Sequence, residues 1–535
     1  MRKWIHGWPM TSGGSTRDAG LGTRDSKPTH LASRVSCLVS ALTALTALTA
    51  LSAMPAHAQS WKQQIDALIM QPPFQSSLWG VALVDEKGKL VYDHNARTMF
   101  VPASNTKILV TSVASALLPP DFTVKTSIYA TGPIEDGVLH GDLILYGRGD
   151  PAVGVRCYAV DTMTPGACDR DPAWQMRKLV AQLQALGITS VDGHIVGDGS
   201  YFEPTMIHPF WNLFDTFWWY AAPVSGLALN DNSVDVHWTP GPKAGAPAQF
   251  TVTPEFTQLR FENRTTTAPA GGETDVPDRM WRTFGTMNAW VEGSVALDSR
   301  GGTESFAVPD PDLFAANALK SVLMENGISV TGTTSSTTDS TTYALVRKTP
   351  ALAEVDSRPL KDWVFPILNT SQNFYAEMLL KQVGKQFGKS GSWDEGIRVE
   401  RQFLIDSVGV DSTQFDVSDG SGLASNNLVS PLAFTQILRF IRKHPHHETF
   451  LTGLPQSGKK GSLRNRFTGT PLASRVQAKT GSISRVNTLS GFIDMGNGRI
   501  WTFSVEVNNQ AVGGGATIRK IDEVVVAMAK AAGVR

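Results

Sequence analysis

The chain has 535 residues, of which 41% are hydrophobic and 18% are charged. This composition is typical of a soluble globular protein, and the length exceeds what one hydrophobic core usually holds, so we expect two or three domains. Lys plus Arg and Asp plus Glu each number 48, and this balance argues against a nucleic-acid-binding protein.

Residues 1–58 have the layout of a secretory signal peptide. Arg34 precedes an apolar stretch from Val35 to Ala53, and the small residues Pro55-Ala56-His57-Ala58 follow it. This order predicts cleavage after Ala58 and a mature protein in the periplasm. The long stretch before the apolar core leaves open a start codon downstream, as at Met10. An uncleaved membrane anchor is the alternative, but the threonine-diluted stretch is short for a stable membrane span.

A hairpin is the first element predicted in the mature chain. Leu78 to Asp85 and Lys89 to Asp93 have strand character, and Glu86-Lys87-Gly88 forms the turn between them.

A helix is predicted next, from near Ser104 to Pro119-Pro120. Three residues make nearly one helical turn, so Ser104 and Lys107 project on the same side. A serine hydroxyl becomes a useful nucleophile when a neighbouring base takes its proton. Lys107 can be that base if burial and a second cation, for which Lys479 is the candidate, keep its amine partly neutral.

The segment from about 123 to 305 changes to short strands and turns, with one helix near Trp174 to Leu186. It is predicted as a β-rich insertion of one or two domains. Cys157 and Cys168 lie in a loop within it, whereas Cys37 falls in the signal. In an oxidising compartment the pair is expected to form a disulfide, with two unlinked thiols as the alternative.

Three other features of this middle region need an interpretation. The aromatic run from His208 to Tyr220 suggests a glycan or membrane contact, but core or interdomain packing is favoured because aromatic residues dominate such contacts. The low-complexity stretches Thr265 to Gly272 and Thr331 to Thr342 are predicted to be exposed loops. None of the 11 histidines has a metal-ligand spacing, so no metal and no cofactor is expected.

Helices return at Asp312 to Asn326 and at Asn373 to Phe387. Ser371-Gln372-Asn373 opens the second of these, and Ser371 and Asn373 are expected to cap it as well as to act in chemistry. Their position places two polar side chains at the start of a buried helix.

The chain closes with strands and one helix. A strand beginning near Arg475 contains Lys479-Thr480-Gly481, and a hairpin of Leu489 to Asp494 and Ile500 to Val507 follows. The Gly at the third motif position is expected to let a substrate backbone lie alongside the strand edge. Thr517 to Ala532 forms a helix that suits packing against a sheet.

Three other strings match the same loose patterns but fail on context. Ser457-Gly458-Lys459-Lys460 lies in a basic loop with no apolar helix after it, and Lys389-Ser390-Gly391 marks the end of a helix. Ser425-Asn426-Asn427 has no helix behind it. Only the ordered set of Ser104 to Lys107, Ser371 to Asn373 and Lys479 to Gly481 remains.

With these three motifs the chain resembles the low-molecular-mass class C penicillin-binding proteins, the D-alanyl-D-alanine carboxypeptidase/endopeptidase family. The resemblance runs from about Ser60 to the C-terminus. The strings that carry it, besides the motifs, include Tyr146-Gly147-Arg148-Gly149-Asp150-Pro151, Ser225-Gly226-Leu227-Ala228-Leu229-Asn230-Asp231-Asn232 and Asp419-Gly420-Ser421-Gly422-Leu423. Asp150 and Asp231 are left out of the catalytic set because turn formation explains them equally well.

The resemblance implies an α/β fold: a β-lactamase/transpeptidase-like domain with a large β-rich insertion. The N-terminal hairpin joins the last strands in an antiparallel sheet, with terminal helices on one face and a helical subdomain on the other. The expected division is a signal peptide at 1–58, the transpeptidase-like domain at 59–122 and 306–535, and the insertion at 123–305.

The resemblance also implies a two-step acyl transfer on peptidoglycan stem peptides, inhibited by β-lactam antibiotics. Ser104 attacks the penultimate D-alanine carbonyl, Lys107 accepts the proton and Ser371 relays one to the leaving amine. Asn373 holds the acyl amide, and Lys479 and Thr480, followed by Gly481, bind the terminal carboxylate. Backbone N–H groups of Ser104 and Ser482 form the oxyanion hole.

Other functions remain open at this point. A β-lactamase or esterase would use the same groups and turn penicillin over quickly, and a non-catalytic envelope-binding protein would bind muropeptides without releasing D-alanine. The balance of carboxypeptidase and endopeptidase activity, the preferred diamino acid and the oligomeric state are also open.

Overall fold

The computed structural model describes residues 60–154 and 171–534. The predicted signal peptide and the Cys157–Cys168 pair lie outside the described residues, so both stay predictions. Among the helices of the described ranges, none combines the length and the apolar character that a membrane crossing requires.

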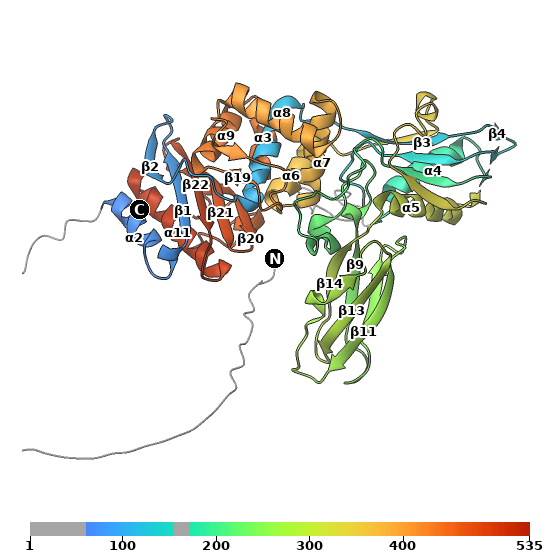
Figure 1. The fold of residues 1–535 in the computed structure, drawn as a ribbon, viewed down its shortest axis with the longest axis horizontal. Coiled ribbons are helices and arrows are strands. Elements are labelled where there is room, and N and C mark those ends of the chain that lie inside the picture. Colours follow the sequence, from blue (N-terminus) through green and yellow to red (C-terminus); the bar gives the residue numbers. More distant parts are fainter. Residues whose placement is uncertain (1–59, 155–170, 535) are drawn as a thin grey trace, which may run out of the picture.

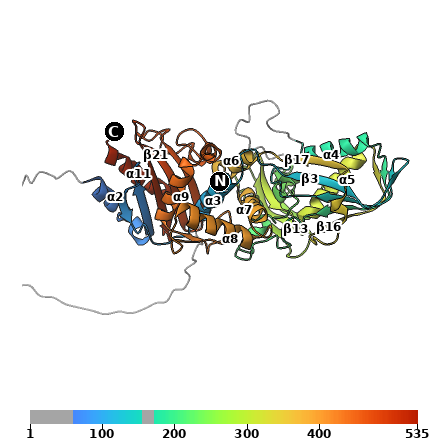
Figure 2. The same cartoon turned by 90° about the horizontal axis from the view of Figure 1, so that it is seen from above.

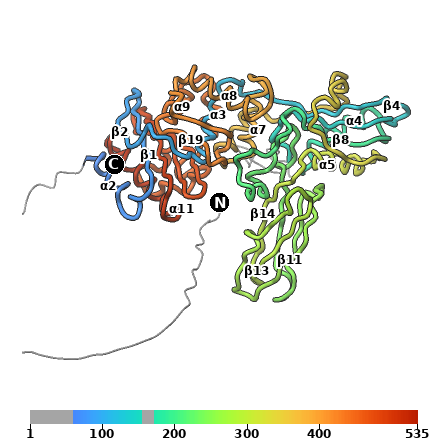
Figure 3. The backbone as a smooth tube through the Cα atoms, viewed as in Figure 1, coloured from blue at the N-terminus to red at the C-terminus, as the bar shows by residue number. Residues whose placement is uncertain are grey.

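The molecule is elongated, with a sheet at one end, helices in the middle and further sheets at the other end (Figure 1). The first sheet has five strands in the order β2-β1-β22-β21-β20, and every neighbouring pair is antiparallel. The first and last segments of the described chain therefore lie side by side (Figure 3), as the sequence predicts. The bounds are β1 Leu78–Val84, β2 Leu90–His94, β20 Val476–Ile483, β21 Val486–Asp494 and β22 Ile500–Asn508.

Helices cover both faces of this sheet (Figure 2). α2 (Trp61–Ile69) and α11 (Gly514–Ala529) share a core with Val81 and Leu83 of β1. Ala82, which points to the opposite face because side chains alternate along a strand, packs with Leu432 of α9 (Pro431–Lys443). The expected layers are confirmed.

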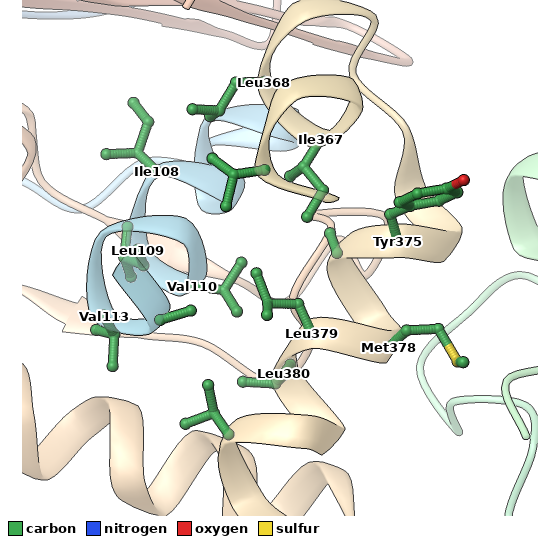
Figure 4. Packing of buried hydrophobic residues seen from close by; sticks show 14 of the residues in the cluster. Ile108, Leu109, Val110, Val113, Ile367, Leu368, Tyr375, Met378, Leu379 and Leu380 are labelled. Carbon is green, nitrogen blue, oxygen red and sulfur yellow. The ribbon is translucent and has the colours of Figure 1, made fainter. Parts of the chain in front are cut away.

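The helical subdomain is built around α3, a helix that is buried on all sides. Every residue from Lys107 to Ser115 is buried, as in a helix at the centre of a core. Its apolar side chains meet those of α6 and α7 (Figure 4). The bounds in this subdomain are α3 Lys107–Leu117, α6 Leu360–Asn369, α7 Asn373–Phe387, α8 Trp393–Phe403, α10 His447–Gly453, β18 Phe415–Asp416 and β19 Leu428–Val429.

The inserted region contains four more sheets. One has the order β16-β8-β6-β3-β17 and another has the order β15-β7-β5-β4. The remaining two are three-stranded, β10-β9-β14 and β11-β13-β12, and they project together away from the other sheets (Figure 1). The bounds are β3 Lys125–Ala130, β4 Ile134–Glu135, β5 Val138–Leu139, β6 Leu143–Tyr146, α4 Trp174–Ala185, β7 Ser190–Val191, β8 Ile195–Asp198, β9 Ser233–Thr239, β10 Gln249–Thr253, β11 Arg260–Ala268, β12 Met280–Arg282, β13 Asn288–Ala296, β14 Gly302–Ala307, α5 Pro311–Glu325, β15 Ser329–Val330, β16 Thr334–Thr337 and β17 Ala353–Asp356.

The division at 59–122, 123–305 and 306–535 stays a prediction, but strand pairing favours a later end for the insertion. β15, β16 and β17 follow residue 305, yet they pair with β7, β8 and β3. These long-range pairs carry the chain back into the insertion before it returns to the helices.

The two low-complexity stretches were predicted as loops, and this was wrong in part. The first overlaps β11, where the buried hydroxyls of Thr265 and Thr267 accept hydrogen bonds from the backbone N–H groups of Ala248 and Gly241. The second contains β16, which is parallel to β8. Threonine is β-branched and suits a pleated strand, so its repetition signalled strands here.

Packing is confirmed for most of the aromatic run. Trp211 belongs to the helical core, and Phe217 and Trp218 belong to the core of the insertion. Phe210 and Phe214 remain exposed at the surface. The run therefore contributes side chains to the cores of both regions.

Candidate active site

The first motif lies at the start of α3. A short 3-10 turn, Ala103–Thr106, presents Ser104, and Lys107 is the first residue of the α-helix. The Lys107 side chain is fully buried and its Nζ lies 2.9 Å from Ser104 Oγ. The sequence prediction that these two heads meet is thus seen in the geometry.

Lys107 has two further partners, and both can only accept hydrogen bonds. Its Nζ donates to Asn373 Oδ1 at 2.7 Å and to the Ser421 carbonyl at 2.7 Å. In the neutral amine two N–H groups stay with these oxygens, so the lone pair must face the Ser104 hydroxyl, the one partner with a proton to give. The geometry therefore points the lone pair of a neutral Lys107 at the Ser104 hydroxyl.

The charge state of Lys107 suits this role. Burial lowers the pKa of Lys107 to about 7, although the carboxylates of Glu377 and Asp419 act in the opposite direction. A general base is most effective when its pKa lies near the working pH. Burial is the leading cause of this low pKa. The expected effect of the Lys479 charge on the pKa of Lys107 is not seen; instead, the charge of Lys107 lowers the pKa of Lys479.

The third motif supplies a second serine–lysine pair. Lys479 Nζ donates to Ser371 Oγ at 2.8 Å and to the Thr480 carbonyl at 2.6 Å. Burial, and then the positive charge of Lys107, hold the pKa of Lys479 well below its usual range. Ser371 has a φ of 65°, a left-handed conformation that costs energy for a residue with a side chain. The turn between α6 and α7 is held in this form at the point where it faces Lys479.

β20 is the edge strand of its sheet and lies against the 3-10 turn that contains Ser104. A Cβ on Gly481 would lie 2.2 Å from Thr488 Oγ1, 2.7 Å from the Pro102 carbonyl and 3.1 Å from the Asn105 nitrogen. Gly481 is thus required for contact between β20 and the turn that holds Ser104. This reason differs from the predicted one, space for a substrate backbone.

The other β20 site residues are tied to their neighbours. Thr480 Oγ1 donates to Ser462 Oγ at 2.8 Å, and Ser482 Oγ donates to Asn487 Oδ1 at 2.8 Å. Ser482 is exposed, so its backbone lies at the accessible end of the strand.

The predicted cap of α7 by Ser371 and Asn373 was wrong. The N-cap residue is Gln372, whose side-chain oxygen accepts a hydrogen bond from the Phe374 N–H at 2.8 Å. The Ser371 hydroxyl is therefore available to bond to Lys479, and the Asn373 side-chain oxygen is available to bond to Lys107. Asn373 Nδ2 also donates to the Tyr220 carbonyl at 2.8 Å. The amide of Asn373 has a second N–H and a second lone pair, so it retains capacity for a ligand.

Sequence reasoning missed two partners of the site. Glu377 is buried four residues after Asn373, and Ser421 contributes its carbonyl. A carboxylate inside an otherwise apolar helical stretch was a usable signal for the first. A backbone carbonyl has no sequence signal beyond the string Asp419-Gly420-Ser421-Gly422 in which it lies.

The strings set aside on context have structural roles. Ser457 is buried, and its hydroxyl donates to the Leu472 carbonyl at 2.7 Å. Asn427 donates to Asp419 Oδ1 at 2.7 Å. Asp150 accepts from the Ala152 N–H at 2.9 Å and so shapes a turn.

Two serine–lysine pairs, with buried lysines and half-buried serines, form a site suited to acyl transfer to serine together with the Asn373 amide. Residues 61–531 match the family described as D-Ala-D-Ala carboxypeptidase 3 (S13). The chain belongs to this family. The S13 match spans both these site residues and the inserted region.

Individual relatives agree with the S13 assignment. The D-alanyl-D-alanine carboxypeptidase of Actinomadura sp. (strain R39) is 28% identical, over 97% of this chain and 92% of that protein. D-alanyl-D-alanine carboxypeptidase DacB of Haemophilus influenzae is 25% identical, over 84% of this chain and 89% of that protein. In fold, the crystal structure of penicillin binding protein 4 (dacB) from H. influenzae is similar with a TM-score of 0.73 at 22% identity, covering 86% of this chain and 98% of that chain.

These findings confirm three expectations from the sequence: the class C penicillin-binding-protein family, the transpeptidase-like α/β fold and a serine-type D-alanyl-D-alanine carboxypeptidase as the enzyme class.

Proposed function

We propose that the enzyme cleaves the bond after the penultimate D-alanine of peptidoglycan stem peptides, and the equivalent bond in cross-links, through an acyl-enzyme on Ser104. One observation carries the proposal: the Lys107 amine, with a pKa of about 7, has the Ser104 hydroxyl as its only proton-bearing partner among those described. Ser104 Oγ attacks the carbonyl carbon while its proton passes to Lys107.

The second pair, Ser371 and Lys479, protonates the leaving amine. Ser371 Oγ, which accepts a hydrogen bond from Lys479 Nζ at 2.8 Å, relays a proton to the amine nitrogen as the C–N bond breaks: it gives up its own proton and takes one from the Lys479 ammonium. Lys479 and Thr480 hold the carboxylate of the departing residue, and Asn373 holds the acyl side. Backbone N–H groups of Ser104 and Ser482 stabilise the oxyanion, each donor contributing about 3 to 4 kcal/mol. Water then releases the acyl group and restores Ser104.

The proposal extends to location and inhibition. The predicted signal at residues 1–58 supports a periplasmic enzyme, where its substrate would lie. A β-lactam presents a strained amide in place of the D-alanyl peptide bond, so it should acylate Ser104 and inhibit the enzyme.

The direct test incubates the purified enzyme with defined uncross-linked and cross-linked muropeptides and identifies the products by mass. Loss of one alanine from uncross-linked substrate is expected, and the ratio to cross-link cleavage gives the balance of the two activities. Prior treatment with penicillin should stop both reactions. Binding of muropeptides without any product would contradict the proposal, and rapid turnover of penicillin would favour a β-lactamase instead.

The pH dependence of acylation follows from Lys107. Since the neutral amine is the base, the single-turnover rate of penicillin acylation should rise with pH, reach half its maximum near pH 7 and fall about tenfold per unit below that. Stopped-flow measurement between pH 5 and 9 checks this. A rate independent of pH across this range would exclude Lys107 as the base.

A further inference from the structure

Helix α7 carries polar side chains at a spacing of four residues along a buried face: Asn373, Glu377 and Lys381. Residues four apart on a helix are neighbours. Asn373 contacts Lys107 directly, but Glu377 has no role in the mechanism above. It is fully buried, and a carboxylate is rarely buried unless it is paired or hydrogen-bonded.

The Glu377 carboxylate accepts hydrogen bonds from the loop between β18 and β19 and from the first residue of α8. Oε1 accepts from the Ser421 N–H at 2.7 Å, and Oε2 accepts from the Gly420 N–H at 3.0 Å and from Trp393 Nε1 at 2.8 Å. Ser421 thus links the two groups: its N–H binds the carboxylate and its carbonyl binds Lys107 Nζ. A shift of Glu377 would move an oxygen that orients the base.

The same loop is braced internally by a second carboxylate. Asp419 accepts from the backbone N–H groups of Gly422 and Ala424 and from the indole of Trp211, at 2.8, 2.7 and 3.0 Å. Asp419 therefore fixes the shape of the loop, while Glu377 fixes its position against α7.

Charged groups surround Glu377 on several elements. Asp419 and Glu400 are the neighbouring acids, and Lys107 and Lys381 the neighbouring cations. Lys381 is paired with Glu203 at 3.3 Å and lies over the Trp393 ring; His208 packs against that ring and faces Asp419.

Burial, and then Asp419, raise the pKa of Glu377 to about 7, while its hydrogen bonds act against this. At pH 7 about half of the Glu377 carboxyls are therefore ionised, and the negative charge next to Lys107 grows as the pH rises.

We propose that Glu377 is a positioning residue for the acylation step: it holds the Ser421 carbonyl against Lys107, and its negative charge favours the protonated lysine. Glu377 thereby opposes the loss of basicity caused by burial and keeps the amine a strong enough base for Ser104. This inference rests on the proposed role of Lys107.

The sign of the charge effect is testable. In Glu377→Gln the carboxylate that stabilises protonated Lys107 is gone, so the amine should lose its proton at lower pH. The acid limb of the acylation profile should then move to lower pH, by at most about one unit because Glu377 itself takes up a proton near pH 7. The amide N–H₂ would also face donors at Gly420 and Trp393, so the loop should shift and the plateau rate should fall by about tenfold or more.

Two other variants separate charge from position. Glu377→Asp retains the charge but shortens the side chain, so the plateau rate should fall while the acid limb stays within about 0.3 pH unit of the original.

Glu400→Gln is the matched control. Glu400 is buried beside Glu377, but neither carboxyl oxygen has a hydrogen-bond partner among the described residues. Burial holds its pKa well above the usual range, so an amide imitates its neutral form.

The experiment measures single-turnover acylation by a fluorescent penicillin between pH 5 and 9, with the melting temperature of each variant. The inference is overturned if folded Glu377→Gln keeps the original acid limb, or if Glu400→Gln moves it equally. If Glu377→Gln does not fold, Glu377→Asp decides, because an unchanged plateau rate would exclude positioning. Absence of any label on Ser104 in the unmodified enzyme would instead refute the proposed function.

Discussion

Ser104→Ala should abolish covalent labelling by penicillin and the release of D-alanine together. The hydroxyl is the atom that forms the acyl bond, and Lys107 lies 2.9 Å from it, so no other described nucleophile shares this base. Intact-protein mass spectrometry after penicillin treatment should show the adduct mass in the unmodified enzyme and none in the variant. Loss of activity by at least about 10³-fold is expected for removal of a covalent nucleophile.

Ser425→Ala is the matched control for this experiment. Ser425 begins the string Ser425-Asn426-Asn427, which resembles the second motif, but it is exposed at the surface. Its variant should be labelled at the original rate. Equal labelling of Ser104→Ala would contradict the assignment of the nucleophile.

Lys107→Met should leave the fold largely intact and slow acylation by about 10³-fold, within the range for loss of a general base. Methionine fills a similar volume. The Asn373 and Ser421 oxygens lose a donor, at a cost of about 1 to 3 kcal/mol each, but the cost of burying an amine disappears as well. Pre-steady-state labelling measures the rate, and calorimetry verifies folding.

Lys460→Met tests whether spacing alone matters. Ser457 and Lys460 have the same separation as Ser104 and Lys107, yet Ser457 bonds to Leu472 and Lys460 to the Thr452 carbonyl. This variant should acylate normally. A folded Lys107→Met protein with the original rate would require a different base, with Lys479 as the next candidate.

Local patterns were enough to predict most of the elements, and the resemblance to a known family implied that the three motifs form one site. The apolar periodicity after Asn373 predicted α7 with the bounds observed, Asn373–Phe387. The Ser104–Lys107 contact follows from helix geometry, because both residues lie within one turn. Such features depend on neighbours in sequence, and a single chain displays them.

The missed features depend on distant parts of the chain. Lys107 meets Asn373 266 positions away and the Ser421 carbonyl 314 positions away, and no local pattern encodes these encounters. The cap of α7 was predicted at Ser371 and Asn373, but Lys479 bonds to the Ser371 hydroxyl and Gln372 is the N-cap residue. The threonine-rich β11 and β16 likewise became strands through partners in the insertion.

The pairing of β1 with β22 has a consequence for how the enzyme comes into being. Val101 and Asn508, 407 positions apart, are joined by a hydrogen bond beside this pair. Forming so distant a contact carries a large loop-closure entropy and slows folding. A nascent chain therefore cannot complete the nucleophile's surroundings until its final strands have emerged, and hydrolytic competence arises only as the last step of assembly.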